Sequence, residues 1–139
     1  MFLFKNLLHF PSIYREREKH LKDLKIVITS TKYNKESNTL LISGNINNYN
    51  QQILLNLIDD KINKTSPIKI HCDCDSFKFE FAKGLNNADG LLNSEIFKPY
   101  FSKIPKDKNI HQIQSGCKHL IAIAQFINHF QYKFEGDIK

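Results

Sequence analysis

All three cysteines of this chain fall in two short motifs, Cys72-Asp-Cys74 and Cys117-Lys-His119. Two residues apart on an extended chain, the side chains of Cys72 and Cys74 project to the same side. Three thiolates and one imidazole make up the four-ligand set of a tetrahedral metal site. If one ion takes all four, the segments near residues 72 and 117 must meet in space. Folds that hold these two segments apart are then excluded.

The chemistry of the four ligands favours zinc, because soft thiolates with one imidazole select zinc over magnesium or calcium. Cys117 and His119 open a long apolar segment that reads as a helix, and the positive end of a helix favours a thiolate. Gly116 directly precedes this pair and is expected to free the backbone so that both side chains converge. We therefore predict one structural zinc ion bound by Cys72, Cys74, Cys117 and His119.

Other interpretations of these residues stay open at this point. The cysteines can be plain buried residues, a disulfide can form with one cysteine left over, or Cys117 can act as a nucleophile beside His119. His71 and His111 are alternative fourth ligands. Four protein ligands close a zinc site, which favours a structural role over an enzyme. The remaining histidines are expected at the surface or in packing: His9, His20 and His129.

Composition narrows the class of protein. The 139 residues fit one domain, and an odd number of cysteines favours a reducing compartment over a secreted disulfide scaffold. The chain has no apolar run long enough to span a bilayer, so no membrane partner is expected. The net charge of +6 suits contact with an anionic partner, but Lys and Arg are spread along the whole chain.

The first 24 residues are expected to form an N-terminal arm and a helix. The arm is apolar up to Phe10, and we expect it to dock either on this protein or on a partner. After Pro11, the segment 12–24 is rich in helix formers and can be capped by Ser12. Its apolar residues that can face inward are Ile13, Leu21 and Leu24.

Residues 25–71 predict an antiparallel β-meander of short strands. The segments 25–33, 39–46 and 67–71 are β-branched or alternate in polarity, and Asn-rich turns fall at 34–38 and 47–50. The segment 51–58 is ambiguous by pattern, and its position among short strands favours a strand.

The remaining residues predict mainly helix and loop. We expect a helix start or an irregular turn at 76–83, a loop at 84–90, a helical turn at 95–98 and a polar loop at 102–116. The segment 118–130 is apolar nearly all round and predicts a buried helix, followed by a loose tail after residue 134. The fold class is thus α+β, with a zinc-binding domain at 25–134 and a tail at 135–139.

The order of the ligands resembles the SWIM-type zinc finger, C-x-C followed by C-x-H. The segment Cys117-Lys-His-Leu-Ile-Ala is similar to the SWIM ending, in which C-x-H opens a buried helix. Cys72-Asp-Cys-Asp-Ser-Phe77 is similar to its first half. The 42 residues between Cys74 and Cys117 exceed the usual SWIM gap, and this longer form resembles small zinc-containing virion or assembly proteins of tailed bacteriophages.

The resemblance implies a binding role without catalysis. Our first hypothesis is a structural or interaction protein, a component of a bacteriophage virion or assembly, whose partners are other proteins of that assembly. The second is a SWIM-like module that binds DNA or RNA through lysines near the zinc. The expected location is the virion or the cytoplasm of the host cell. The lysines are Lys78, Lys83, Lys98, Lys103, Lys106, Lys108 and Lys118.

Overall fold

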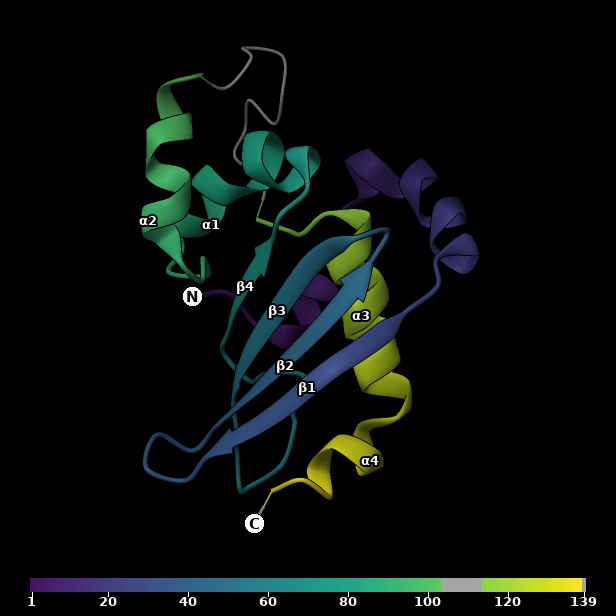
Figure 1. The fold of residues 1–139 in the computed structure, drawn as a ribbon, viewed down its shortest axis with the longest axis vertical. Helices are drawn as coiled ribbons and strands as arrows, with labels where there is room; N and C mark the ends of the chain where they lie inside the picture. Colours follow the sequence, from purple (N-terminus) through teal and green to yellow (C-terminus); the bar gives the residue numbers. More distant parts are fainter. Residues whose placement is uncertain (104–113, 139) are drawn as a thin grey trace.

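Four strands follow one another along the chain and pair antiparallel in the same order, which confirms the predicted meander (Figure 1). The computed structural model describes residues 1–103 and 114–138. The strands are β1 (Val27–Asn34), β2 (Thr39–Ile46), β3 (Tyr49–Asn56) and β4 (Ile68–Cys72). The ambiguous segment at 51–58 is thus mostly strand, and the fold class is α+β as predicted.

Asparagine sets the sharpest turn of the sheet. Asn47 and Asn48 both have positive φ, at 55° and 66°, and join Ile46 to its partner Tyr49 as a two-residue hairpin. Asparagine tolerates this left-handed backbone better than other non-glycine residues, and the turn matches the twist of the strands. The turn fixes the β2–β3 register, so that alternate residues of β2 face inward: Leu40, Ile42, Gly44 and Ile46.

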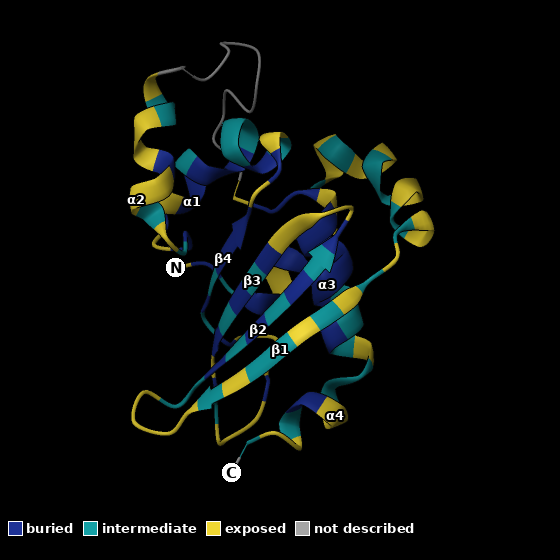
Figure 2. Cartoon of the chain, viewed as in Figure 1, coloured by how far each residue is buried: buried dark blue, intermediate teal, exposed yellow. Residues whose placement is uncertain are grey.

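The predicted C-terminal helix covers one face of this sheet. Helix α3 (Lys118–His129) lies behind the strands in Figure 1, and the buried residues concentrate between the two layers (Figure 2). Gly44 marks the closest approach, since a Cβ there would lie 2.7 Å from Ile123 Cδ1. A glycine inside a strand is expected where another element comes this close.

The N-terminal arm docks on this chain itself. Its short 3₁₀ helix η1 (Phe4–Leu7) lies beside α3, and Phe2, Phe4 and Leu7 are buried. The backbone is held as well: Ile68 N donates to Phe2 O at 2.9 Å, and Phe4 N donates to Ser66 O at 2.9 Å. The arm therefore shares one hydrophobic core with the sheet and α3.

The charged segment after Pro11 is helical, but as a 3₁₀ helix, η2 (Ser12–Asp23). The prediction of which η2 side chains face inward is only partly confirmed. Leu21 and Leu24 pack on the core, whereas Ile13 is 61% exposed, so the expectation for Ile13 is wrong. The 3₁₀ geometry explains this difference, because its three-residue turn changes which side chains share a face.

The segment after β4 is more helical than predicted. The π-helix η3 (Phe77–Phe81) runs directly into α1 (Ala82–Asn87), so the loop predicted at 84–90 begins only after Asn87. The segment then returns to the sheet, where Ile70 N donates to Gly90 O and Leu92 N donates to Ile70 O, both at 2.9 Å. These bonds cover the free edge of β4, an edge that would otherwise expose unpaired backbone groups.

The remaining elements are short. They are α2 (Ser94–Phe97), η4 (Lys98–Lys103) and α4 (Gln131–Glu135). Within the predicted polar loop, residues 102 and 103 belong to η4 and residues 104–113 lie outside the described residues. Phe134 is buried and Ile138 packs partly on the core. In the part of the chain described, no helix combines the length and apolarity needed to cross a membrane.

Replacing Phe4 with alanine tests whether the arm belongs to the core. Phe4 is fully buried, so Phe4→Ala is expected to lower the free energy of unfolding by about 3–5 kcal/mol. Ile13→Ala is the control, because this exposed residue should change stability by no more than about 0.5 kcal/mol. Urea unfolding of both variants measures the difference, and equal stabilities would contradict a core role for the arm.

Candidate metal centre

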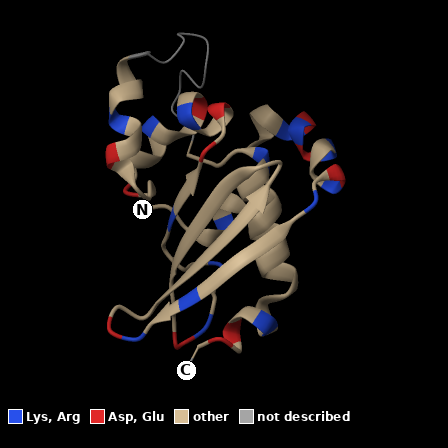
Figure 3. Ribbon diagram, in the orientation of Figure 1, with Lys and Arg blue, Asp and Glu red and all other residues tan. Residues whose placement is uncertain are grey.

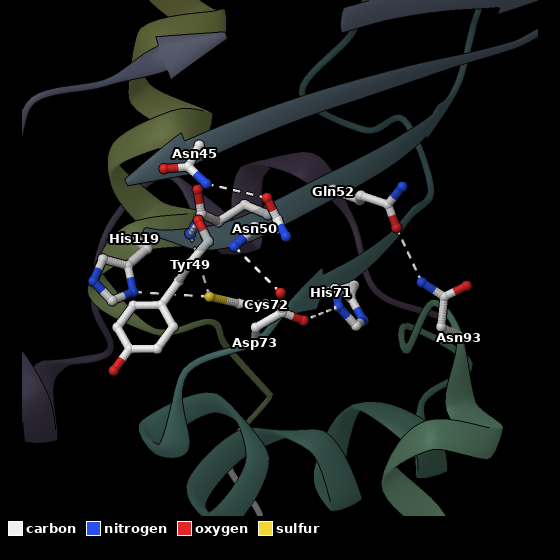
Figure 4. Close-up of polar contacts among 10 residues, drawn as sticks. Asn45, Tyr49, Asn50, Gln52, His71, Cys72, Asp73, Asn93 and His119 are labelled. Atoms are coloured by element: carbon white, nitrogen blue, oxygen red, sulfur yellow. Dashed lines mark hydrogen bonds and ion pairs between the residues drawn. The ribbon is translucent and has the colours of Figure 1, made fainter. Parts of the chain in front are cut away.

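The four predicted ligands come from two places that the fold brings together. Cys72 is the last residue of β4, and Cys74 follows it just before η3. Cys117 is the N-cap residue of α3, and His119 lies in the first turn of that helix. Figure 4 shows His119 reaching from α3 toward Cys72 at the strand end.

The geometry of the cluster suits a single tetrahedral ion. The three Sγ atoms and one imidazole nitrogen lie within 4.8 Å of one another, and all four residues are buried. His119 Nδ1 lies 3.8 Å from Cys72 Sγ and 3.9 Å from Cys117 Sγ. Tetrahedral zinc, with Zn–S near 2.3 Å and Zn–N near 2.0–2.1 Å, places sulfur and nitrogen about 3.6 Å apart. The four side chains can therefore hold a metal ion after small adjustments.

The alternative fourth ligand His71 faces the opposite side of the sheet. Because strand residues alternate, Cys72 points toward α3 while His71 points to the other face of the sheet. His71 Nε2 lies 2.7 Å from Asp73 Oδ1 (Figure 4). The His71 ring packs on Phe97. The other candidate, His111, lies outside the described residues.

The cysteines are present as free thiols in mutual contact, and the alternative of a disulfide is not observed. Hydrogen bonds from Cys117 and Cys72 hold the pKa of Cys74 far below its usual value. A hydrogen bond with Cys117 lowers the pKa of Cys72, but its bond to Cys74 and burial outweigh this and raise it to about 12. Burial, with hydrogen bonds to the other two sulfurs, raises the pKa of Cys117. Without metal, these shifts favour negative charge on Cys74 and protons on Cys72 and Cys117.

Two N–H groups point at the sulfurs. The backbone N–H of Phe77 donates to Cys74 Sγ at 3.4 Å, and Gln51 Nε2 donates to Cys72 Sγ at 3.6 Å. Gln51 is fully buried, and the same amide also donates to Tyr49 O at 2.7 Å. A buried amide is costly without partners, so its place beside a sulfur indicates a role at the site.

Sequence reasoning missed Gln51, although a signal was present. It stands at a core-facing position of β3, in register with Cys72 and followed on the same face by Ile53 and Leu55. Tyr49 was missed as well, and its ring lies 5.5 Å from the ring of His119. A polar residue at an apolar position directly opposite a predicted ligand is a recognisable mark of a supporting residue.

Gly116 has a different role from the one predicted. No glycine among the described residues has positive φ, so conformational freedom is not the reason for it. A Cβ at Gly116 would instead lie 2.7 Å from Leu7 Cδ1 and 3.1 Å from Leu120 Cβ. The glycine lets the N-terminal arm pass close to the start of α3.

A cleft of about 440 Å³ opens beside the cluster. Its walls come from η2, the β2–β3 turn, η3 and the first turn of α3. Cys74, Cys117 and His119 line it, whereas Cys72 does not. The other lining residues are Arg17, His20, Asn47, Tyr49, Asp75, Ser76, Glu80 and Lys118.

The lysines proposed for phosphate contact are interleaved with acidic groups (Figure 3). Lys78 pairs with Asp75 at 3.8 Å, and Lys98 pairs with Glu95 at 2.8 Å. Lys106 and Lys108 lie outside the described residues. Among the residues that are described, these pairs reduce the positive charge available to a nucleic acid.

Comparisons with protein-family models, with curated proteins and with solved structures find no significant match to this chain.

Metal binding at this site is expected to release about two protons near neutral pH, because Cys72 and Cys117 are protonated in the metal-free fold and thiolates in the complex. Affinity should then fall about 100-fold for each unit by which the pH drops. Calorimetric titration with zinc in buffers of different ionisation enthalpy counts the protons. Release of about three would contradict the preformed cluster, since separate thiols would all be protonated.

Gln51→Leu is expected to lower zinc affinity by about 10–100-fold, the range for residues that support metal ligands. The substitution removes the N–H donor to Cys72 Sγ while keeping the position apolar. Gln52→Leu is the matched control, since Gln52 lies on the other face of the sheet, where it accepts a bond from Asn93. Competition with a chromogenic chelator measures both affinities, and equal values would exclude a role for Gln51.

Proposed function

We propose that this protein binds one zinc ion through Cys72, Cys74, Cys117 and His119, and that the ion is structural. The observation that carries the proposal is the burial of all four ligand atoms within 4.8 Å of one another. Zinc is favoured over copper or iron because three thiolates and one imidazole in a four-coordinate site are typical of structural zinc.

The energy of such a site is comparable with the stability of a whole domain. Structural zinc supplies on the order of 10–16 kcal/mol of apparent binding free energy, while domains are stable by roughly 5–15 kcal/mol. In this chain the ion would join the end of β4 to the start of α3, across 42 intervening residues between Cys74 and Cys117. The zinc then links the sheet to its covering helix.

We further propose that the site is not catalytic. A catalytic zinc keeps an open position for water and has a base nearby, whereas four protein ligands close the coordination sphere. Glu80 lines the adjoining cleft and is the glutamate that could be considered as such a base. It is held by Arg17 at 2.9 Å and by Ser76 at 3.4 Å, which suits a structural ion pair.

The biological setting in our proposal is a larger protein assembly, namely a tailed-bacteriophage virion or an assembly intermediate of one. The support for it is the resemblance of the two ligand motifs, with their long gap, to small zinc-containing proteins of tailed bacteriophages. Nucleic-acid binding is the alternative function, and the mixed charges of Figure 3 favour it less than protein contacts. Identifying the neighbours of this chain in a purified assembly would decide between them.

The metal proposal is tested by metal analysis and chelation of the purified chain. We expect one zinc per chain, and we expect EDTA to lower the melting temperature and the helical circular-dichroism signal. Cys117→Ser should lose the metal, while Lys118→Ala, between the two ligands and exposed, should retain it. An unchanged melting curve after complete zinc removal would refute the structural role.

A further inference from the structure

The metal centre is shielded unevenly from solvent. Cys72 is fully buried and does not border the cleft beside the cluster. Cys74 and Cys117 do border it, at 4% and 1% exposure. A small reactant that enters this cleft therefore reaches the walls formed by Cys74 and Cys117, whereas Cys72 is not part of those walls.

The three sulfurs also differ in their hydrogen bonds. Cys74 Sγ accepts the backbone N–H of Phe77, and Cys72 Sγ accepts the amide of Gln51. Cys117 Sγ accepts no hydrogen bond from a backbone or amide N–H within residues 1–103 and 114–138; it contacts His119 Nδ1 there at 3.9 Å. A hydrogen bond withdraws electron density from a thiolate, so the sulfur without one is the strongest nucleophile of the three.

We propose that Cys117 is an oxidative modification site for small peroxides and that Cys74 resolves it into a disulfide with release of the zinc. This inference rests on the proposed zinc site. Both residues border the same cleft, whereas Cys72 is screened from it, so the pair Cys74–Cys117 forms in preference to either pair that includes Cys72.

The reaction balances with hydrogen peroxide as the oxidant. The Cys117 thiolate attacks one peroxide oxygen; an S–O bond forms, the O–O bond breaks and hydroxide leaves. The Cys74 thiolate then attacks the sulfenic sulfur; an S–S bond forms, the S–O bond breaks and a second hydroxide leaves. Two thiolates lose two electrons, the peroxide gains them, and both hydroxides become water by taking protons from solvent. Zinc keeps its charge and dissociates because two of its four ligands are gone.

The product would keep the two halves of the site joined. A Cys74–Cys117 disulfide connects the segment after β4 to the start of α3, the same segments that the ion links. A Cys72–Cys74 disulfide would leave α3 free. The identity of the oxidised pair therefore decides whether the fold survives the loss of its metal.

The test uses the full zinc-loaded chain, whose zinc content is measured first. Hydrogen peroxide is added in stepwise amounts, released zinc is read with a chromogenic indicator, and the disulfide is mapped by peptide mass spectrometry without reduction. We expect one zinc released for each disulfide and a Cys74–Cys117 linkage. A Cys72–Cys74 linkage, or full retention of zinc at excess peroxide, would overturn the inference while leaving the zinc site intact. A chain purified without zinc would instead contradict the proposed function.

A second measurement tests the route of entry. Ser76 borders the cleft and ligates nothing, so Ser76→Tyr narrows the approach to Cys117. We expect slower zinc release by peroxide with unchanged zinc content. Ser43→Tyr, on the opposite face of the sheet, is the matched control and should react at the wild-type rate. Equal rates for both zinc-loaded variants would overturn the assigned route. If the Ser76→Tyr variant loses its zinc, the disulfide mapped in the wild-type chain decides whether the inference stands.

Discussion

The convergence of three sulfurs and one imidazole is the constraint on which the arrangement of this fold depends. Like-charged thiolates repel, so a cluster of three is stable only with protons or a metal ion between them. In the metal-free fold, the lowered pKa of Cys74 and the raised pKa values of Cys72 and Cys117 favour negative charge on Cys74 and protons on the other two sulfurs. A bound zinc ion, as proposed, would replace those protons with one doubly charged centre. In that proposal, the end of the sheet and the start of its covering helix are joined by metal coordination as well as by apolar contact.

The sequence predicted the parts of this protein that rest on local rules. Alternating strands with asparagine turns specified the meander, and a continuous apolar segment specified α3. The ligand set was predicted because cysteine is rare in this chain and every copy falls in one of two motifs. Such signals need no knowledge of distant contacts, and the structure brings all four predicted ligands together.

The features that sequence analysis missed depend on contacts between distant segments. Whether the arm met this chain or another could not be read from its apolar character, since the answer lies in the hydrogen bonds with Ser66 and Ile68. The role of Gly116 followed from the proximity of Leu7, more than a hundred residues earlier. Gln51 became meaningful only through the register that sets it opposite Cys72. In each case the deciding neighbour is remote in sequence.

The docking of the arm has a consequence for the order in which the protein can fold. Residues near the N-terminus complete the core only together with α3, where the Gln125 amide donates to Leu8 O at 2.7 Å. The meander has short connections and can pair early, because local contacts close small loops. Leu7 and Leu8 of the arm therefore stay partly uncovered until α3 has been synthesised. During translation these apolar side chains are therefore the expected targets for a chaperone that binds exposed apolar segments.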